Sequence, residues 1–352
     1  MNIKGLLLGS AAALVAVSSA RAADAIVIAE PEPMEYVRIC DMYGAGYFYI
    51  PGTENCLKIG GYMRYEMLYD EFGGVDGGYS FTKMARFAPN FSVKNETEWG
   101  TLTGYAEVEF DWYSGVGFEN PITGDVTIGS LTSINLLYAY ISLETASGTF
   151  LVGKTENPYS RFLGFAGPTL FEGAYPYYAS GEVSYTYTNQ NGFSAILAAV
   201  EIETSDKFDV GIEGGFNFEK DWGSIGAIAG YDMDAESWGA RAVGRFKVPS
   251  TEIEATLQGF YSSEDTPGIY HVYDPYGDVT EWSVLAGASV ALNEKIGLAG
   301  SAQWFDTDAW QFIANVPFTP VDGFAVTPEV VYSTGDGQSD FWLGRVRFQR
   351  SF

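Results

Sequence analysis

Apolar and polar side chains alternate with a period of two over most of the chain after residue 56. In residues 101–112, one face is apolar and the opposite face carries Glu107, Glu109 and Asp111. The same arrangement recurs at residues 58–67, 238–248 and 252–261. A period of two is that of a β-strand, whose successive side chains point to opposite sides of a sheet. The pattern therefore predicts strands with one apolar and one polar face.

The connections between these segments alternate in length. Short turns are expected at residues 95–98, 145–148, 189–192, 220–223 and 293–295. Longer, acidic and glycine-rich links are expected at residues 70–78, 113–132, 264–280 and 333–340. Short turns on one rim and long loops on the other are typical of outer-membrane barrels. We count roughly 14 to 16 strands from Leu57 onward, and about 16 strands enclose an aqueous channel.

A soluble β-sandwich would also alternate, but its apolar face would have to be buried inside the protein. Aromatic residues often stand near the ends of the expected strands, as Trp112, Tyr138, Trp238, Tyr261 and Trp282 do. Such placement is typical of the aromatic girdles at membrane interfaces. The fold class expected is all-β: a transmembrane antiparallel β-barrel of about 16 strands.

The chain divides into three expected parts. Residues 1–22 have the form of a secretory signal peptide, with Lys4, an apolar run and the small-x-small sequence Ala20-Arg21-Ala22. Residues 23–56 are expected to form an extended segment, and residues 57–352 the barrel. The expected location is the bacterial outer membrane.

Composition supports a membrane barrel and excludes one class of partner. Charged residues make up 18% and aromatic residues 16% of the chain, and the mean hydropathy is −0.01. Soluble domains have about 25% charged residues. The formal net charge of −26 excludes nucleic-acid binding driven by counterion release.

The two cysteines, Cys40 and Cys56, are expected to form a disulfide, because exported chains meet an oxidising compartment. Free thiols are the alternative. Neither a metal site nor a cofactor is indicated. Carboxylates two residues apart, in Asp232/Asp234 and Asp306/Asp308, could hold divalent cations that bridge to lipopolysaccharide, but solvated loops are the simpler interpretation.

The two ends of the chain carry a family resemblance. The opening 66 residues, from MNIKGLLLGS to CLKIGGYMRYE, and the ending VRFQRSF resemble the general porins of alphaproteobacteria related to Brucella and Rhizobium. We expect a water-filled channel for small hydrophilic solutes and ions. The resemblance implies that they diffuse passively through a homotrimer of barrels, each narrowed by a long loop folded into its lumen. It also implies that Phe352 and Phe348 signal to the barrel-assembly machinery, although Arg350 replaces an aromatic residue of that signal.

The constriction loop is expected at residues 157–180. Residues 148–154 look like the fifth strand of general porins, and the stretch after them has three prolines, three glycines and many aromatic residues. Proline and glycine argue against a strand. An external loop or a trimer contact is the alternative. The charged residues expected in this loop are Arg161 and Glu172, and Lys154 and Glu156 flank it.

Charges on the inward faces of the strands are the other candidate pore residues. An arginine facing lipid near the midplane costs roughly 2–4 kcal/mol, so arginines should face the lumen. Those expected there are Arg64, Arg86, Arg241, Arg245, Arg345 and Arg347. Acids could oppose them, among them Glu66, Glu107, Glu109, Asp111, Glu252 and Glu254. Each could equally be a solvated wall charge. Together with acidic loops, they suggest weak cation preference.

Three alternative functions remain open. A barrel enzyme would need a histidine as base, and His271 is the only one in the chain, in a loop among tyrosines. We regard it as an incidental surface residue and expect no enzymatic activity. Aromatic side chains in the expected loop could instead stack on sugar rings, which would make a substrate-specific channel. A plugged, structural barrel is the third alternative.

Overall fold

The computed structural model of the chain describes residues 38–71, 78–119, 126–202, 209–263 and 268–352. It divides into two units, Met1–Arg38 and Ile39–Phe352, and every element described below belongs to the second. The expected signal peptide 1–22 lies outside the described residues. Within the described ranges, no helix is long and apolar enough to cross a membrane.

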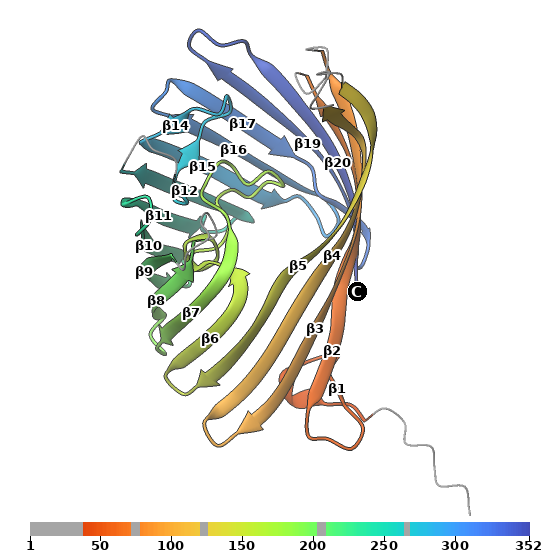
Figure 1. Ribbon diagram of the computed structural model, residues 1–352, viewed down its shortest axis with the longest axis vertical. Helices are drawn as coiled ribbons and strands as arrows, with labels where there is room; N and C mark the ends of the chain where they lie inside the picture. The colour runs from red at the N-terminus through yellow and green to blue at the C-terminus, as the bar shows by residue number, and fades with distance from the viewer. Residues whose placement is uncertain (1–37, 72–77, 120–125, 203–208, 264–267) are drawn as a thin grey trace, which may run out of the picture. The chain divides into compact units, whose positions relative to one another are not determined.

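Sixteen of the 18 strands in the main sheet pair in a closed antiparallel ring (Figure 1). The ring closes where the first of these strands, β2 (Cys56–Asp70), pairs with the last, β20 (Phe341–Ser351). The expected all-β barrel of about 16 strands is therefore confirmed.

The other strands of the ring are β3 (Ser80–Thr97), β4 (Gly100–Glu119), β5 (Val126–Thr145), β6 (Gly148–Glu156), β7 (Ala179–Thr188), β8 (Phe193–Glu201), β9 (Val210–Lys220), β10 (Gly223–Asp232), β11 (Ser237–Lys247), β12 (Ile253–Ser262), β15 (Trp282–Ala291), β16 (Gly297–Phe305), β17 (Ala309–Asn315) and β19 (Phe324–Gly335). Outside the ring are η1 (Asp41–Tyr43), β1 (Phe48–Tyr49), α2 (Pro158–Arg161), β13 (Val272–Tyr273), β14 (Val279–Thr280) and β18 (Phe318–Val321).

The two faces of the wall differ as the alternation predicts. On β4, Phe110 is 42% exposed on the outside, whereas its neighbours Glu109 and Asp111 are buried on the inside. Aromatic side chains gather near strand ends on the outside: the rings of Trp238 and Trp282 lie 4.7 and 4.6 Å from that of Tyr261 between them. An apolar outer face suits lipid, and a polar inner face suits water.

One expected link is wrong. Residues 113–132 were expected to form a loop, but β4 continues to Glu119 and β5 begins at Val126. Both strands have 20 residues, about twice the length that spans a bilayer. Beyond the bilayer both faces of a hairpin can meet water, so the period-two polarity that marks a strand disappears. A bulge at Gly115, whose φ is 83°, interrupts it further.

The C-terminal residue is joined to the first strand of the ring. The amide of Phe352 donates to the carbonyl of Gly61 at 3.0 Å, and the Gly61 amide donates back at 3.2 Å. Phe352 also stacks on Phe87, with 6.4 Å between ring centroids. Arg350, which replaces the expected aromatic residue, donates to the carbonyl of Asp322 at 2.9 Å in the neighbouring turn.

The disulfide between Cys40 and Cys56 is confirmed. It holds residues 39–49 at the rim that carries the short turns, which is the periplasmic rim in barrels of this kind. The Tyr47 hydroxyl lies 2.8 Å from the Ser92 hydroxyl, and the Lys94 ammonium stands 5.8 Å from the Tyr47 ring. Since Ser92 and Lys94 share the inward face of β3, the N-terminal segment lies against the inner wall.

Removing the disulfide, in the double variant Cys40→Ser, Cys56→Ser, should release this segment and leave the barrel closed. The bond closes a loop of about 15 residues, which is worth roughly 3 kcal/mol of chain entropy. Limited proteolysis with mass spectrometry should find cleavage between residues 39 and 55 in the variant and in the reduced parent, but not in the oxidised parent. Equal protection in all three would contradict this account.

Candidate functional site: a loop inside the barrel

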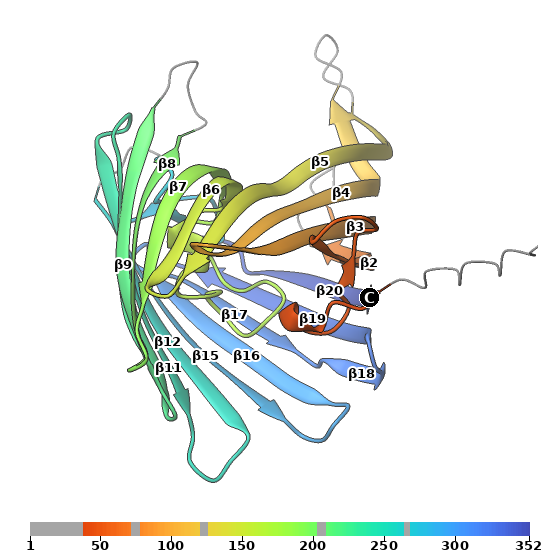
Figure 2. The same cartoon turned by 90° about the horizontal axis from the view of Figure 1, so that it is seen from below.

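Residues 157–178, here called the luminal loop, connect β6 to β7 and lie inside the ring of strands (Figure 2). The loop follows the fifth strand of the ring, as expected. Tyr159, Leu163 and Ala166 are buried and pack on inward side chains of β8 to β16. The alternative of an external loop is therefore excluded.

Glu213 on β9 binds the root of the luminal loop. Its side chain is fully buried, and one carboxylate oxygen accepts the amide of Tyr159 at 2.6 Å. The other accepts the Tyr178 hydroxyl at 2.9 Å and the side-chain amide of Asn157. Both ends of the loop are thus tied to one carboxylate. Sequence reasoning missed Glu213, because its partners in the loop are distant in sequence and its own neighbours in the chain do not mark it as buried.

Arg241 and Arg245 of β11 bind the middle of the luminal loop. Arg241 is 1% exposed and donates to the carbonyls of Tyr159 and Ser160, at 3.2 and 3.3 Å, and to that of Gly164. Arg245 donates to the carbonyls of Leu163 and Phe165. A guanidinium offers five donors, so two arginines can satisfy a stretch of irregular backbone. These arginines were expected on the open wall but lie beneath the loop.

Further wall side chains hold the tip of the loop. Gln303 makes two hydrogen bonds of 2.7 Å with the backbone of Ala174, one to its amide and one to its carbonyl. Glu329 accepts a hydrogen bond from the amide of Leu170 at 2.6 Å. The Nε atom of Arg345 lies 4.0 Å from the other carboxylate oxygen of Glu329. At the root, Arg161 pairs with Glu182.

The tip of the luminal loop faces the opposite wall across an open central cavity of about 550 Å³. Its charged lining consists of three arginines from β2, β3 and β20 and four glutamates from the wall and the loop: Arg64, Arg86, Arg347, Glu107, Glu109, Glu156 and Glu172. His271 and Tyr273 also line it. His271 is only 5% exposed, so our interpretation of it as a surface residue was wrong.

The arginines of the central cavity are joined to further wall groups. Arg86 binds Asp111 through two hydrogen bonds of 2.8 Å and also pairs with Glu109. Arg347 pairs with Glu66, and Arg64 donates to the amide oxygen of Gln349 at 2.9 Å. The basic groups thus form one patch on the wall opposite the loop.

Tyrosine hydroxyls bind the acids of the central cavity. Tyr105 donates to Glu107 at 2.7 Å, and Tyr175 donates to Glu172 at 2.9 Å. Burial raises the pKa of Glu172, and the hydrogen bond from Tyr175 opposes that shift in part. Glu172 therefore protonates at a higher pH than an exposed glutamate.

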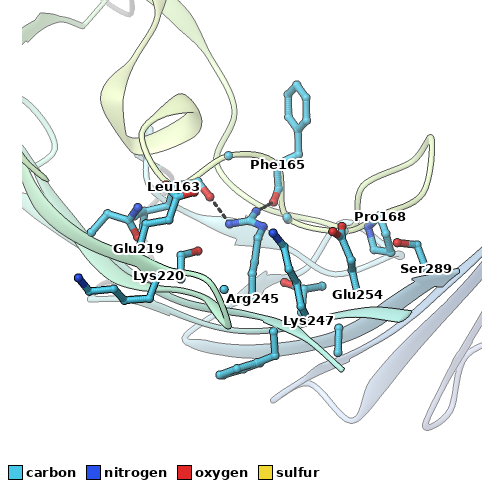
Figure 3. A pocket seen from close by; sticks show the side chains of 18 of the residues that line it. Leu163, Phe165, Pro168, Glu219, Lys220, Arg245, Lys247, Glu254 and Ser289 are labelled. Atoms are coloured by element: carbon cyan, nitrogen blue, oxygen red, sulfur yellow. Dashed lines mark hydrogen bonds between the residues drawn. The ribbon is translucent and has the colours of Figure 1, made fainter. Parts of the chain in front are cut away.

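Five of the ten expected pore residues do not line the central cavity. Arg161, Arg241 and Arg345 bind the loop or wall acids, as described above, and the other two are Lys154 and Arg245. Lys154 shares a face of β6 with Val152, which is 50% exposed on the outside of the barrel. Arg245 lines a second cavity of about 570 Å³, between residues 162–168 of the loop and the wall (Figure 3). Lys220, Lys247 and Glu254 stand around it near the periplasmic rim.

Comparison with solved structures shows the fold alone. The outer membrane channel DcaP of Acinetobacter baumannii aligns with a TM-score of 0.61 and 16% identity, covering 86% of this chain and 99% of that one. An anion-selective porin from Comamonas acidovorans aligns with a TM-score of 0.59 and 12% identity, covering 85% of this chain and all of that one.

Comparison of sequences identifies the family. Porin Omp2a of Brucella melitensis is 40% identical over 377 residues, and porin Omp2b of Brucella neotomae is 39% identical over 376; both alignments cover each chain fully. The family model described as "Porin subfamily" matches residues 24–347. These relatives are channel proteins and not enzymes. With its closed 16-strand barrel, the chain belongs to this porin family and forms a channel in the bacterial outer membrane.

Proposed function

We propose that this porin is a weakly cation-selective diffusion pore, narrowed by the luminal loop and assembled as a homotrimer. The observation that carries the selectivity is the set of charges around the central cavity. Its three arginines are accompanied by four glutamates in the lining. Glu66 and Asp111, which bind two of the arginines, bring the carboxylates of the network to six.

An excess of fixed negative charge raises the local concentration of cations, over a distance of about 8 Å at physiological salt. The fold does not decide the sign of selectivity, because a porin of similar fold is described as anion-selective. The lining charges decide it, and here they favour potassium over chloride. Because the arginines form one patch, anions can still pass beside it, so the preference is weak.

The packing of the loop favours general diffusion over a sugar-specific track. Phe162 packs in a cluster with buried wall residues, and Tyr178 is hydrogen-bonded to Glu213. The Tyr175 ring lies 5.1 Å from the guanidinium of Arg241. Phe165 and Tyr177 are about half exposed, at 52% and 47%. A stacking track needs a row of free aromatic faces, and Phe162, Tyr175 and Tyr178 are each engaged with wall side chains instead.

Substituting Glu172→Gln should lower the permeability ratio of potassium to chloride by roughly twofold, because it removes one unit charge several ångströms from the ion path. Acidification should act in the same direction in the parent, since burial raises the pKa of Glu172. The measurement is the reversal potential of a planar bilayer under a potassium chloride gradient.

The matched control is Glu294→Gln, the same change in an exposed turn at the periplasmic rim. It should leave the reversal potential unchanged. Equal permeation of potassium and chloride through the parent channel would refute the proposed preference.

Substituting Arg241→Met should loosen the luminal loop, because three loop carbonyls lose their donor. Hydrogen bonds to charged groups contribute about 1.5–3 kcal/mol each, so loop amides near residues 158–165 should exchange at least tenfold faster. Hydrogen–deuterium exchange of the trimer in detergent measures this. Arg350→Met, which alters an arginine at the periplasmic rim that binds the turn at Asp322, is the control. Unchanged exchange in the Arg241 variant would mean that other contacts hold the loop.

The trimer is supported by a hollow on the lipid-facing side of β2 to β5. This hollow, of about 740 Å³, surrounds the small side chain of Ala85 and is lined by exposed apolar residues: Met63, Phe87, Phe110, Trp112 and Ile134. Side chains of a second copy could fill this hollow and would then bury the apolar side chains that line it.

Filling this hollow with Ala85→Trp should reduce the trimer fraction without preventing barrel folding, because a large ring would occupy the space proposed for a neighbour. Ala242→Trp makes the same change in a hollow on β10 to β12 and should have no effect. Unheated gel electrophoresis and sedimentation in detergent report the trimer. Loss of the trimer in both variants, or in neither, would place the contact elsewhere.

A further inference from the structure

A second loop also enters the lumen. Residues 268–281, here called the outer loop, precede β15 and contain the small sheet β13–β14. Tyr270, Val272 and Thr280 of this loop are at most 2% exposed. Val272 packs with Phe260 and Phe305 of the inner wall. A solvated surface loop would not bury these side chains.

Glycines of the wall form a slot for the Tyr270 ring. A Cβ atom at Gly230 would lie 2.3 Å from the Cζ atom of Tyr270, and one at Gly239 would lie 2.6 Å from its Cβ atom. Gly230 and Gly239 are opposite each other on β10 and β11. No other residue type could occupy these positions while the ring is in place, so the sequence reserves this space for Tyr270.

Tyr270 joins the outer loop to the luminal loop. Its hydroxyl donates to Glu213 at 2.9 Å, on the carboxylate oxygen that also accepts Tyr178. Its ring centroid lies 5.1 Å from that of Tyr159. One buried carboxylate therefore fixes both loops, and displacement of either leaves that carboxylate with fewer donors.

The far end of the outer loop is tied down as well. Thr307 donates to the Asp274 carboxylate at 2.8 Å, and the Tyr276 hydroxyl donates to the carbonyl of Ser339 at 3.1 Å. These partners belong to the connections before β17 and before β20. Between the two attachments, His271 and Tyr273 are presented to the central cavity.

We propose that the narrow part of this pore is built from two loops, and that Tyr270 is the positioning residue that holds the second one in the solute path. The inference rests on the proposed narrowing of the pore by the luminal loop. It adds the outer loop as a second part of the narrow region. Both loops lean on the glycine-containing half of the wall and face the arginine patch, so a solute passes between that patch and the two loops together.

The first test substitutes Tyr270→Ala and Tyr270→Phe and records single-channel conductance and the size limit for polyethylene glycols. The alanine variant should raise conductance by roughly 1.5-fold or more, because the outer loop leaves the path. The phenylalanine variant keeps the ring in its slot and should show a smaller rise. Tyr231→Ala, which changes a tyrosine on the outer face of β10 next to Gly230, is the matched control.

A second test displaces the Tyr270 ring from its slot by a substitution in the wall and leaves Tyr270 itself unchanged. Gly230→Val should reproduce the effect of Tyr270→Ala, whereas Gly259→Val, at a glycine whose Cβ would meet no atom within 4 Å, should not.

A third test places a thiol at the central cavity. A charged thiosulfonate reagent should lower the current through Tyr273→Cys and should leave the current through Glu294→Cys unchanged. The native cysteines form a disulfide and do not react.

Heat-modifiable migration in gels verifies that each variant barrel has folded. Parent-like conductance in folded Tyr270→Ala and Gly230→Val barrels would overturn the proposal. If Glu172→Gln still shifted selectivity, the luminal loop alone would form the constriction. If neither substitution had an effect, the narrow part of the pore would lie elsewhere, and the proposed function would fail together with this inference.

Discussion

Irregular backbone inside a β-barrel carries peptide groups that no neighbouring strand can satisfy. Each such group, if buried without a partner, costs roughly 1–3 kcal/mol, so the luminal loop of residues 157–178 needs polar partners on the wall. This porin meets the requirement with side chains of the wall. Glu213 accepts a loop amide, Arg241 and Arg245 donate to five loop carbonyls, and Gln303 does both. The position of the loop follows from where these side chains stand.

The same requirement divides the inward charges into two groups. Glu213 and Arg241 are almost completely buried and bind backbone, so they contribute structure rather than a surface for ions. Arg86 and Arg347 remain partly exposed, at 17% for each side chain, and face the central cavity. Counting every inward charge as a pore charge would therefore mislead. The proposed selectivity rests on the second group, in which carboxylates outnumber arginines.

The fold was predictable because each barrel strand repeats its alternation of apolar and polar residues over about ten residues. The pairing of β2 with β20 that closes the ring is ordinary antiparallel pairing. The loop inside the lumen was also predictable, since prolines, glycines and aromatic residues together fit neither a strand nor a solvated link. Its partners were not. Glu213 stands 56 residues from Asn157, and nothing local distinguishes it from a solvated acid. The burial of His271 was missed for the same reason, because its loop packs inward through contacts of Tyr270 and Val272 with residues distant in sequence.

Glycine explains why both loops choose the same half of the barrel. Besides the slot for Tyr270, a Cβ atom at Gly226 would lie 2.6 Å from Leu163, and one at Gly287 would lie 2.8 Å from Pro168. Strands β10, β11 and β15 thus have glycines beside the side chains that bind the loops, whereas β2 to β4 carry arginines and acids on the facing wall. A loop can pack closely on a wall position that has no side chain. Large charged side chains that need hydration keep a loop away from the wall. The asymmetry of inward side-chain size around the ring, readable strand by strand once the register is known, therefore determines on which side the pore stays open.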